Sequence, residues 1–342
     1  MYGNQVRIFN LYISNSDMKR FARNIVLIFL PVFSLLAWYI IDDPFMMYWP
    51  NKNLCEYGQR KQCINVAYRG IRWMDQYEDS MHYNSFIIGS SRSHFYYVDD
   101  WKKYLSKDAS CFHFGQSSDN LLGGLQRVKY LYKRYERIDN MLIVMDEEYL
   151  CEMKPHTGLL YRTPWQVTED NDFLAFNREC VLAFFSLEYQ KQIWGTKRVN
   201  NEFHYYYIPE FNELHKDEAE LLLESNPDEY YRLLNKDSVL YARTGRDTVA
   251  RQVILDEQRR ALNELSALLK KHNTDYRIVI SPLYNQITLN PLDLQFLNEI
   301  FGEDRVFDFS GVNEYTNDIT NYYETSHYRP KLCSQILKCI YQ

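Results

Sequence analysis

Five short apolar segments alternate with helical patterns along the chain, and this alternation restricts the fold more than any other feature of the sequence. Helical patterns occupy residues 119–137 and 247–272. Strands joined by helical crossovers form parallel sheets with helices on both faces. We therefore expect an α/β fold, a three-layer sandwich around a five-stranded parallel sheet. Its expected strands are Phe86–Ile88, Cys111–Phe114, Met141–Met145, Tyr276–Ile280 and Arg305–Phe309.

Residues 151–246 do not follow this alternation. The segment is rich in Tyr, Phe, Glu and Asp, and it has helical patterns at 176–194 and 216–234. We interpret it as a mainly helical insertion after the third strand, a place where insertions often form a cap. Its tyrosine groups at 205–207 and 230–231 either line a groove or pack against the core, and packing is the commoner role.

The N-terminal region carries the features of a single membrane anchor. Residues 25–41 contain no charge, and 17 residues are close to the shortest helix that spans a bilayer. Lys19, Arg20 and Arg23 precede this run, and Asp42 and Asp43 follow it. Under the positive-inside rule, residues 1–23 are expected in the cytoplasm and the rest of the chain outside it. We expect an uncleaved signal anchor at residues 24–41, because no clear small-residue cleavage site follows.

Composition limits the possible partners and cofactors. The net charge is -6, and no basic stripe with interleaved aromatic residues is visible, so nucleic acid is not expected as a partner. His82, His94 and His113 lack the spacing of a zinc site, and no cofactor is expected. Residues 42–84 are interpreted as a connector. It contains Cys55 and Cys63, which either pair in an oxidising compartment or stay free.

The first expected strand ends in Gly89-Ser90-Ser91, a combination typical of a sharp turn. In α/β proteins, chemistry gathers in the loops at the carboxyl ends of the strands. A turn at that place can hold a serine hydroxyl in the open. Ser91 is therefore a candidate nucleophile, although the same tripeptide also serves as a plain strand-to-helix turn.

A histidine and an acid near the C-terminus could activate that serine. His327 follows the last expected strand, precedes the final helix, and has Glu324 three residues before it. A serine nucleophile needs a base to take its proton, and the base needs a third group to fix its tautomer. Ser91, His327 and Glu324 would supply these three roles. His94, three residues after Ser91, is a minor rival for the base.

These motifs resemble the blocks of the SGNH (GDSL-type) hydrolases. The resemblance rests on Gly89-Ser90-Ser91, Gly115 after the second strand, Ser281-Pro282 after a later strand, and Glu324-x-x-His327 before the last helix. It covers residues 85–145 and 247–342. The branch it resembles most is membrane-anchored and includes the D-alanyl-transfer protein of teichoic acid modification and the alginate O-acetylation proteins.

The resemblance implies a flavodoxin-like SGNH domain over residues 85–342, with Ser91 as nucleophile, His327 as base, Glu324 as acid and Gly115 as a backbone oxyanion donor. The chain departs from the pattern in two ways. Glu324 stands where the family usually has Asp, and Asp146-Glu147-Glu148 replaces the Gly-x-Asn-Asp block after the third strand. Asn120 is only a weak substitute for the missing Asn donor.

Together these features predict a membrane-anchored, extracytoplasmic esterase or O-acyltransferase that acts on acyl esters of cell-envelope glycan, at the cell surface or in the periplasm. An acyl donor or acylated glycan is the expected substrate, and a membrane-bound acyltransferase is a candidate partner. The alternative is a catalytically idle SGNH-like domain that binds glycan or a membrane partner during polysaccharide assembly. The intact Ser, His and Glu favour the enzyme, whereas the missing Asn block favours the alternative.

Overall fold

The computed structural model describes residues 15–49, 65–170, 172–187, 189–190, 203, 205–234, 239–243 and 248–342. Cys55 and Cys63 lie outside these residues. The chain divides into two compact units, Met1–Pro50 and Asn51–Gln342.

The first unit contains one long helix, α1 (Asn15–Asp42). Its stretch Met18–Asp42, 25 residues long, has the length and composition to cross a membrane. The helix continues through Pro31, as membrane helices often do. Just after the helix, the Asp43 carboxylate accepts hydrogen bonds from the backbone N–H groups of Met47, Tyr48 and Trp49 at 2.7, 3.0 and 2.7 Å. The expected apolar helix is therefore present, and a tight turn ends it.

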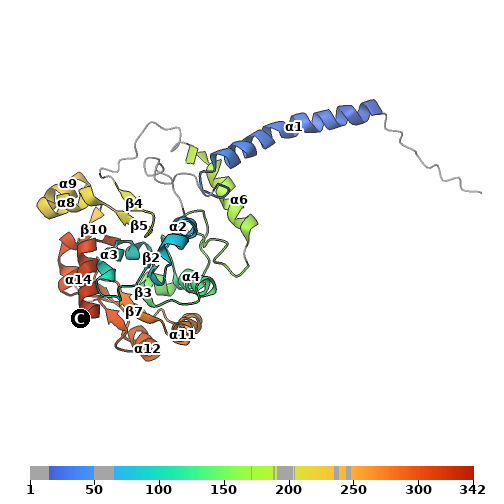
Figure 1. Cartoon of the computed structure of the whole chain (residues 1–342). Helices are drawn as coiled ribbons and strands as arrows, with labels where there is room; N and C mark the ends of the chain where they lie inside the picture. Colours follow the sequence, from blue (N-terminus) through green and yellow to red (C-terminus); the bar gives the residue numbers. More distant parts are fainter. Residues whose placement is uncertain are drawn as a thin grey trace, which may run out of the picture. The chain divides into compact units, whose positions relative to one another are not determined.

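The second unit is built around a five-stranded sheet in which every pair of neighbouring strands is parallel, as predicted (Figure 1). The strand order is β2-β1-β3-β7-β9, one of the common orders of doubly wound sheets. The strands are β1 (Ser85–Gly89), β2 (Cys111–His113), β3 (Asn140–Met145), β7 (Asp275–Ile280) and β9 (Val306–Asp308).

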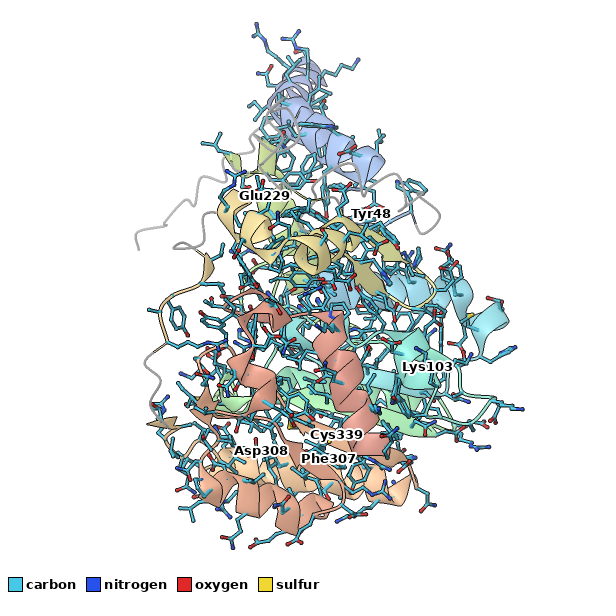
Figure 2. All side chains as sticks on the ribbon, turned by 90° about the vertical axis from the view of Figure 1, so that its left-hand side faces the viewer. Tyr48, Lys103, Glu229, Phe307, Asp308 and Cys339 are labelled. Carbon is cyan, nitrogen blue, oxygen red and sulfur yellow. The ribbon has the colours of Figure 1, made fainter. Side chains whose placement is uncertain are left out.

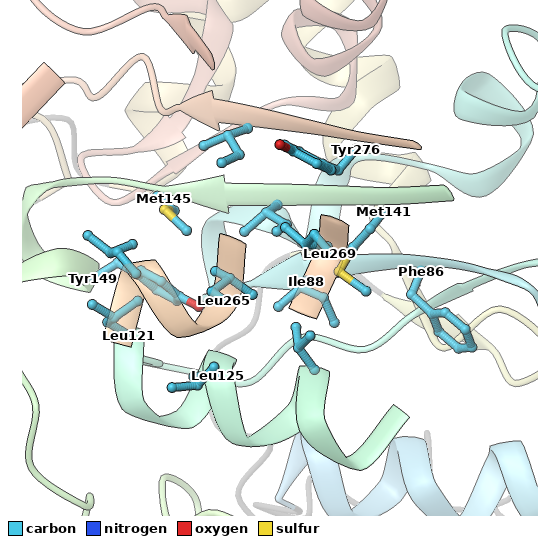
Figure 3. Close-up of a cluster of buried hydrophobic side chains, with 14 of the residues drawn as sticks. Phe86, Ile88, Leu121, Leu125, Met141, Met145, Tyr149, Leu265, Leu269 and Tyr276 are labelled. Carbon is cyan, nitrogen blue, oxygen red and sulfur yellow. The ribbon is translucent and has the colours of Figure 1, made fainter. Parts of the chain in front are cut away.

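Helices cover both faces of this sheet. Alternate residues of a strand therefore belong to two different hydrophobic cores. Phe86 and Ile88 belong to the first core, and Ile87 between them belongs to the second. Figure 3 shows part of the first core, with Ile88 of β1 beside Leu269 of α11. Its helices are α2 (Val66–Met81), α4 (Leu121–Arg134), α5 (Glu147–Cys151), α11 (Asp256–Lys271) and α12 (Pro291–Phe301).

The second core lies under α3 (Val98–Lys102) and the C-terminal helix α14 (Pro330–Tyr341). Phe307 of β9 packs against this core, and Figure 2 labels it together with Cys339 of α14. Residues 42–84 were expected to form a connector, but α2 within them supplies buried core residues such as Ile71 and Met74. That part of the segment belongs to the folded body.

The insertion is partly helical, with α6 (Phe173–Phe184), α8 (Asp217–Ser225) and α9 (Pro227–Leu233). It also forms a short antiparallel hairpin from β4 (Tyr206–Ile208) and β5 (Glu213–His215). The expected helix at 216–234 is divided because Asn226-Pro227 begins a new helix. Tyr230 and Tyr231 are buried, so packing is their role.

The predicted helix at 247–272 begins later than expected, at Asp256. The backbone N–H groups of Val253 and Ile254 donate to the buried Asp293 carboxylate at 2.8 and 3.0 Å, which holds these residues outside the helix. Just before them, β6 (Thr248–Val249) pairs in parallel with β8 (Ile287–Thr288).

The chain between β9 and α14 contains short elements rather than a plain loop. They are the helix α13 (Glu314–Asn317), the 3-10 turn η3 (Ile319–Asn321), and the antiparallel strands β10 (Tyr322–Glu324) and β11 (His327–Tyr328). The β10–β11 hairpin carries both Glu324 and His327. Its position ahead of α14 agrees with the predicted order, and its strand character was not predicted.

Candidate active site

Ser91 lies at the carboxyl end of β1, where it begins the 3-10 turn η2 (Ser91–Phe95). The turn is tight because Gly89 approaches its neighbours closely: a Cβ there would lie 2.8 Å from Ser93 Cβ and from Val144 O. Ser93 is fully buried, and its hydroxyl donates to Ser90 O at 2.7 Å. Ser90 is also buried. Of the three serines, Ser91 alone is partly accessible, so local packing selects it.

The structure brings together the three side chains that the sequence selected. Ser91 Oγ and His327 Nε2 are 2.9 Å apart, a hydrogen-bond distance. The other ring nitrogen, His327 Nδ1, contacts Glu324 Oε1 at hydrogen-bonding range. A histidine that shares Nδ1–H with a carboxylate keeps Nε2 free to accept a proton. The resulting chain, Ser91 to His327 to Glu324, has the order of a catalytic triad.

Glu324 is held in place by its own hairpin. It pairs with His327 across β10 and β11, and its Oε2 accepts the Ser326 backbone N–H at 2.6 Å. Burial alone would raise the pKa of Glu324, but the hydrogen bond and charge of His327, the Ser326 N–H and the nearby Lys216 together lower that pKa below its ordinary value. The carboxylate therefore stays ionised, as the acid of a triad must be.

Arg92 joins the nucleophile turn to its surroundings. Its Nη1 lies 2.8 Å from Asp146, and its Nη2 lies 2.7 Å from Glu148. Its Nε donates to Ser326 O at 3.4 Å, beside His327. Burial acts to lower the pKa of Arg92, but Asp146 and Glu148 raise it, so the guanidinium stays charged. The acidic stretch after β3, which departs from the SGNH pattern, thus binds the residue that follows Ser91.

Gly115 lies close to the same turn. A Cβ on Gly115 would lie 3.1 Å from Ser93 Oγ and 3.2 Å from Gly89 O. Only glycine fits so near both residues, since the same Cβ would lie 2.6 Å from the His113 ring. The next residue, Gln116, donates its backbone N–H to Gly89 O at 3.1 Å. Gly115 is therefore beside the end of β1, and its role as an oxyanion donor stays a prediction.

Asn120 has a different environment. Its Oδ1 accepts the Gly123 N–H at 3.0 Å and so caps α4. Its Nδ2 donates to Lys154 O at 2.8 Å and lies 3.1 Å from His156 Nε2. Both ends of the amide are engaged away from Ser91. We therefore do not include Asn120 among the oxyanion donors.

His94 does not act as a rival base in this geometry. It lies against the ring of His113, with centroids 5.3 Å apart, and burial lowers its pKa. Its Nε2 is buried and has no hydrogen-bond partner among the residues that the structure describes. His113 is also buried and has one bond, to Ser93 O at 2.8 Å. Within the described ranges, no group of three or more His, Cys, Asp or Glu side chains could hold a metal ion.

Sequence reasoning missed the support that the insertion gives to the β10–β11 hairpin. Tyr231 Oη lies 2.7 Å from Tyr322 O and 2.8 Å from Ile319 O. Arg329, at the end of the hairpin, is bonded by Nε and Nη2 to the Glu220 carboxylate at 3.0 and 2.9 Å. The residues in these contacts are 88 to 109 positions apart in the sequence, so no local sequence pattern could predict them.

No protein-family model matches this chain, and no curated protein matches it.

Proposed function

We propose that this protein is a membrane-anchored serine esterase or O-acyltransferase of the SGNH type, which uses Ser91, His327 and Glu324 on acyl esters. One observation carries the proposal: a serine at the tip of a strand is hydrogen-bonded to a histidine whose other nitrogen contacts a carboxylate. The order of the sheet strands and the resemblance to the SGNH blocks support it.

The reaction would follow from the roles of these three side chains. Ser91 Oγ attacks the ester carbonyl while His327 Nε2 takes its proton, and Glu324 stabilises the imidazolium that forms. His327 then returns the proton to the departing alkoxide, which leaves an acyl group on Ser91. Water or a sugar hydroxyl, deprotonated by His327, attacks the acyl-serine, and His327 returns that proton to Ser91 Oγ as the bond between Oγ and the acyl group breaks. Hydrolysis results in the first case and acyl transfer in the second.

The tetrahedral intermediate carries a negative oxygen that needs hydrogen-bond donors. Backbone N–H groups near Ser91 and the N–H of Gly115 are the proposed donors. Asn120 is excluded because its amide protons are engaged elsewhere.

The proposed location follows from the first unit. An apolar helix long enough to span a membrane, preceded by basic residues, would anchor the enzyme with its catalytic unit outside the cytoplasm. Acylated envelope glycan is then the proposed substrate. A membrane-bound acyltransferase is the proposed source of acyl groups if the reaction is a transfer.

A catalytically idle, glycan-binding domain is the second candidate. The observation in its favour is the missing oxyanion donor: the residue after the third strand is Asp146, which contacts Arg92, and Asn120 caps a helix. Such a domain would keep the fold and bind glycan without turnover.

Turnover of a neutral aryl acetate by the full chain in detergent tests the proposal. The wild-type chain should release phenol, and Ser91→Ala should release none above background. Ser90→Ala, a neighbouring serine outside the triad, should keep measurable turnover. An inactive wild-type chain that is folded by circular dichroism would favour the idle domain.

A further inference from the structure

A cation from the insertion lies beside the proposed triad. Lys216 follows β5 and precedes α8, and its side chain makes no capping hydrogen bond. Its Nζ lies 4.5 Å from the ring centroid of Tyr323 and 5.2 Å from that of Phe95. The Phe95 ring is in turn 6.2 Å from the ring of His327. Lys216 therefore lies against the residues that surround the base.

The strand before Lys216 is fastened to the nucleophile segment, so this position is fixed. The Glu213 carboxylate of β5 accepts the backbone N–H of Val98. His215 stacks on Tyr97 with ring centroids 4.1 Å apart. Both partners follow closely after Ser91 in the sequence. The insertion thus delivers Lys216 to the site through a packed connection.

The charges near the triad are paired, with Lys216 as the exception. Arg92 contacts Asp146 and Glu148, and Arg329 contacts Glu220. Glu324 is hydrogen-bonded to His327 and Ser326. Among the residues that the structure describes, none places a carboxylate oxygen within 4.0 Å of Lys216 Nζ or accepts a hydrogen bond from it.

An ammonium group in this position is costly to keep. Burial lowers the pKa of Lys216, and the more distant Glu324 and Glu220 only partly oppose that effect. Two aromatic faces attract the charge, but neither is an anion that could neutralise it. A half-buried cation without a carboxylate partner among the described residues is suited to receive an anion, because charge-assisted hydrogen bonds are the strong ones.

We propose that Lys216 forms an anion subsite of the active site, which selects substrates carrying a carboxylate or phosphate group near the scissile ester. This inference rests on the proposed function. It adds that the ester substrate carries a negative charge. The anionic group could belong to the acyl chain or to the glycan alcohol. In both cases Lys216 would bind it while Ser91 attacks the neighbouring carbonyl.

Two matched ester pairs test the proposal and separate these sources. Phenyl hydrogen succinate and its methyl ester differ by one negative charge on the acyl side. The compounds 4-acetoxybenzoate and methyl 4-acetoxybenzoate differ by one charge on the alcohol side. For each pair, the ratio of kcat/KM for the anionic to the neutral ester is measured with the full chain in nonionic detergent. The variants are Lys216→Met, Lys216→Arg and, as a control at the opposite edge of the sheet, the exposed Lys271→Met.

We expect Lys216→Met to lower this ratio about ten- to a hundredfold for at least one pair, the effect of losing a hydrogen bond to a charged group. Lys216→Arg should keep most of the ratio, and Lys271→Met should leave it unchanged. The pair that responds identifies the side of the ester on which the anion lies. An unchanged ratio in Lys216→Met, or equal losses on anionic and neutral esters, would overturn the proposal.

The inference can be separated from the proposed function. If the wild-type chain turns over no ester, the enzyme proposal fails, but the same pairs still serve as ligands. Affinities are then measured by NMR titration of the Ser91→Ala chain and of the Ser91→Ala/Lys216→Met chain. Tighter binding of an anionic ester that depends on Lys216 supports the subsite. Equal affinities in the two chains contradict it.

Discussion

At the scale of single residues, the contact between Glu324 and His327 decides whether His327 can act as the base for Ser91. Both side chains lie on one hairpin, and the longer arm of Glu is absorbed because its second oxygen binds the Ser326 N–H. The local backbone therefore accommodates the longer Glu side chain at a position where the SGNH hydrolases that the sequence resembles usually have Asp. The carboxylate reaches Nδ1 of a histidine whose Nε2 is at Ser91.

Replacing Glu324 by Gln should lower kcat/KM by about three to four orders of magnitude, because the neutral amide stabilises the imidazolium poorly and can hold the wrong tautomer. The fold should persist, since Gln keeps the size of the side chain. Ester turnover and circular dichroism check the two halves of this prediction, with the exposed Glu303→Gln as a control. Turnover within tenfold of wild type would remove Glu324 from the catalytic role.

Arg92 and Asp146 form a second pair that can be tested. Asp146 has only 2% of its side chain exposed, so Arg92→Gln would leave a buried carboxylate without its cation. We expect a loss of stability on the order of 3 kcal/mol. Adding Asp146→Asn should recover part of it, because Asn can still cap α5 while carrying no charge. Urea unfolding of the wild type, the two single variants and the double variant gives the coupling energy between Arg92 and Asp146. Additive losses of stability would show that the ion pair contributes nothing.

At the scale of elements, β2 and η2 place the rings of His113 and His94 against each other, and His113 is fully buried. Burial lowers the pKa of His113 to about 4, from the ordinary value of 6.5. His113 therefore binds a proton near pH 6.5 in the unfolded chain, but only near pH 4 in the folded chain. The contribution of His113 to the free energy of unfolding should be fully present above pH 6.5 and should be lost as the pH decreases from 6.5 towards 4.

The His113 contribution to this loss should be on the order of 3 kcal/mol. His113→Asn removes the titrating group, so its unfolding free energy should decline less steeply between pH 6.5 and 4. His82→Asn, an exposed residue at the end of α2, is the matched control and should keep the wild-type slope. Equal slopes in His113→Asn and wild type would mean that His113 is protonated in the folded chain.

The elements also show how far the sequence could predict this structure. The five strands were predictable because each contains a short, mainly apolar run, and the clearest of them, Met141–Met145, is buried throughout. The start of α11 was not, since the buried Asp293 that holds Val253 and Ile254 comes much later in the chain. The triad residues could be selected from local motifs. The ion pairs of Arg92 and the position of Lys216 could not be predicted, because contacts between distant parts of the chain alone define their environments.

For the whole molecule, the account requires that the second unit lies outside the cytoplasm. An alkaline phosphatase fused to the C-terminus should be active, and a fluorescent protein that folds only in the cytoplasm should stay dark. Replacing the basic residues before α1, Lys19, Arg20 and Arg23, by Glu should lower the phosphatase signal. An inactive phosphatase fusion together with a fluorescent reporter fusion, both in the wild-type chain, would contradict the envelope location.

If Ser91 is an activated nucleophile, it should react with a fluorophosphonate, and mass spectrometry of the treated full chain measures this reaction. We expect one adduct per chain, mapped by peptide fragmentation to Ser91. We also expect the adduct to be absent in Ser91→Ala and to form far more slowly in His327→Ala. A folded wild-type chain that forms no adduct, or an adduct that maps to Ser90 or Ser93, would contradict this role of Ser91.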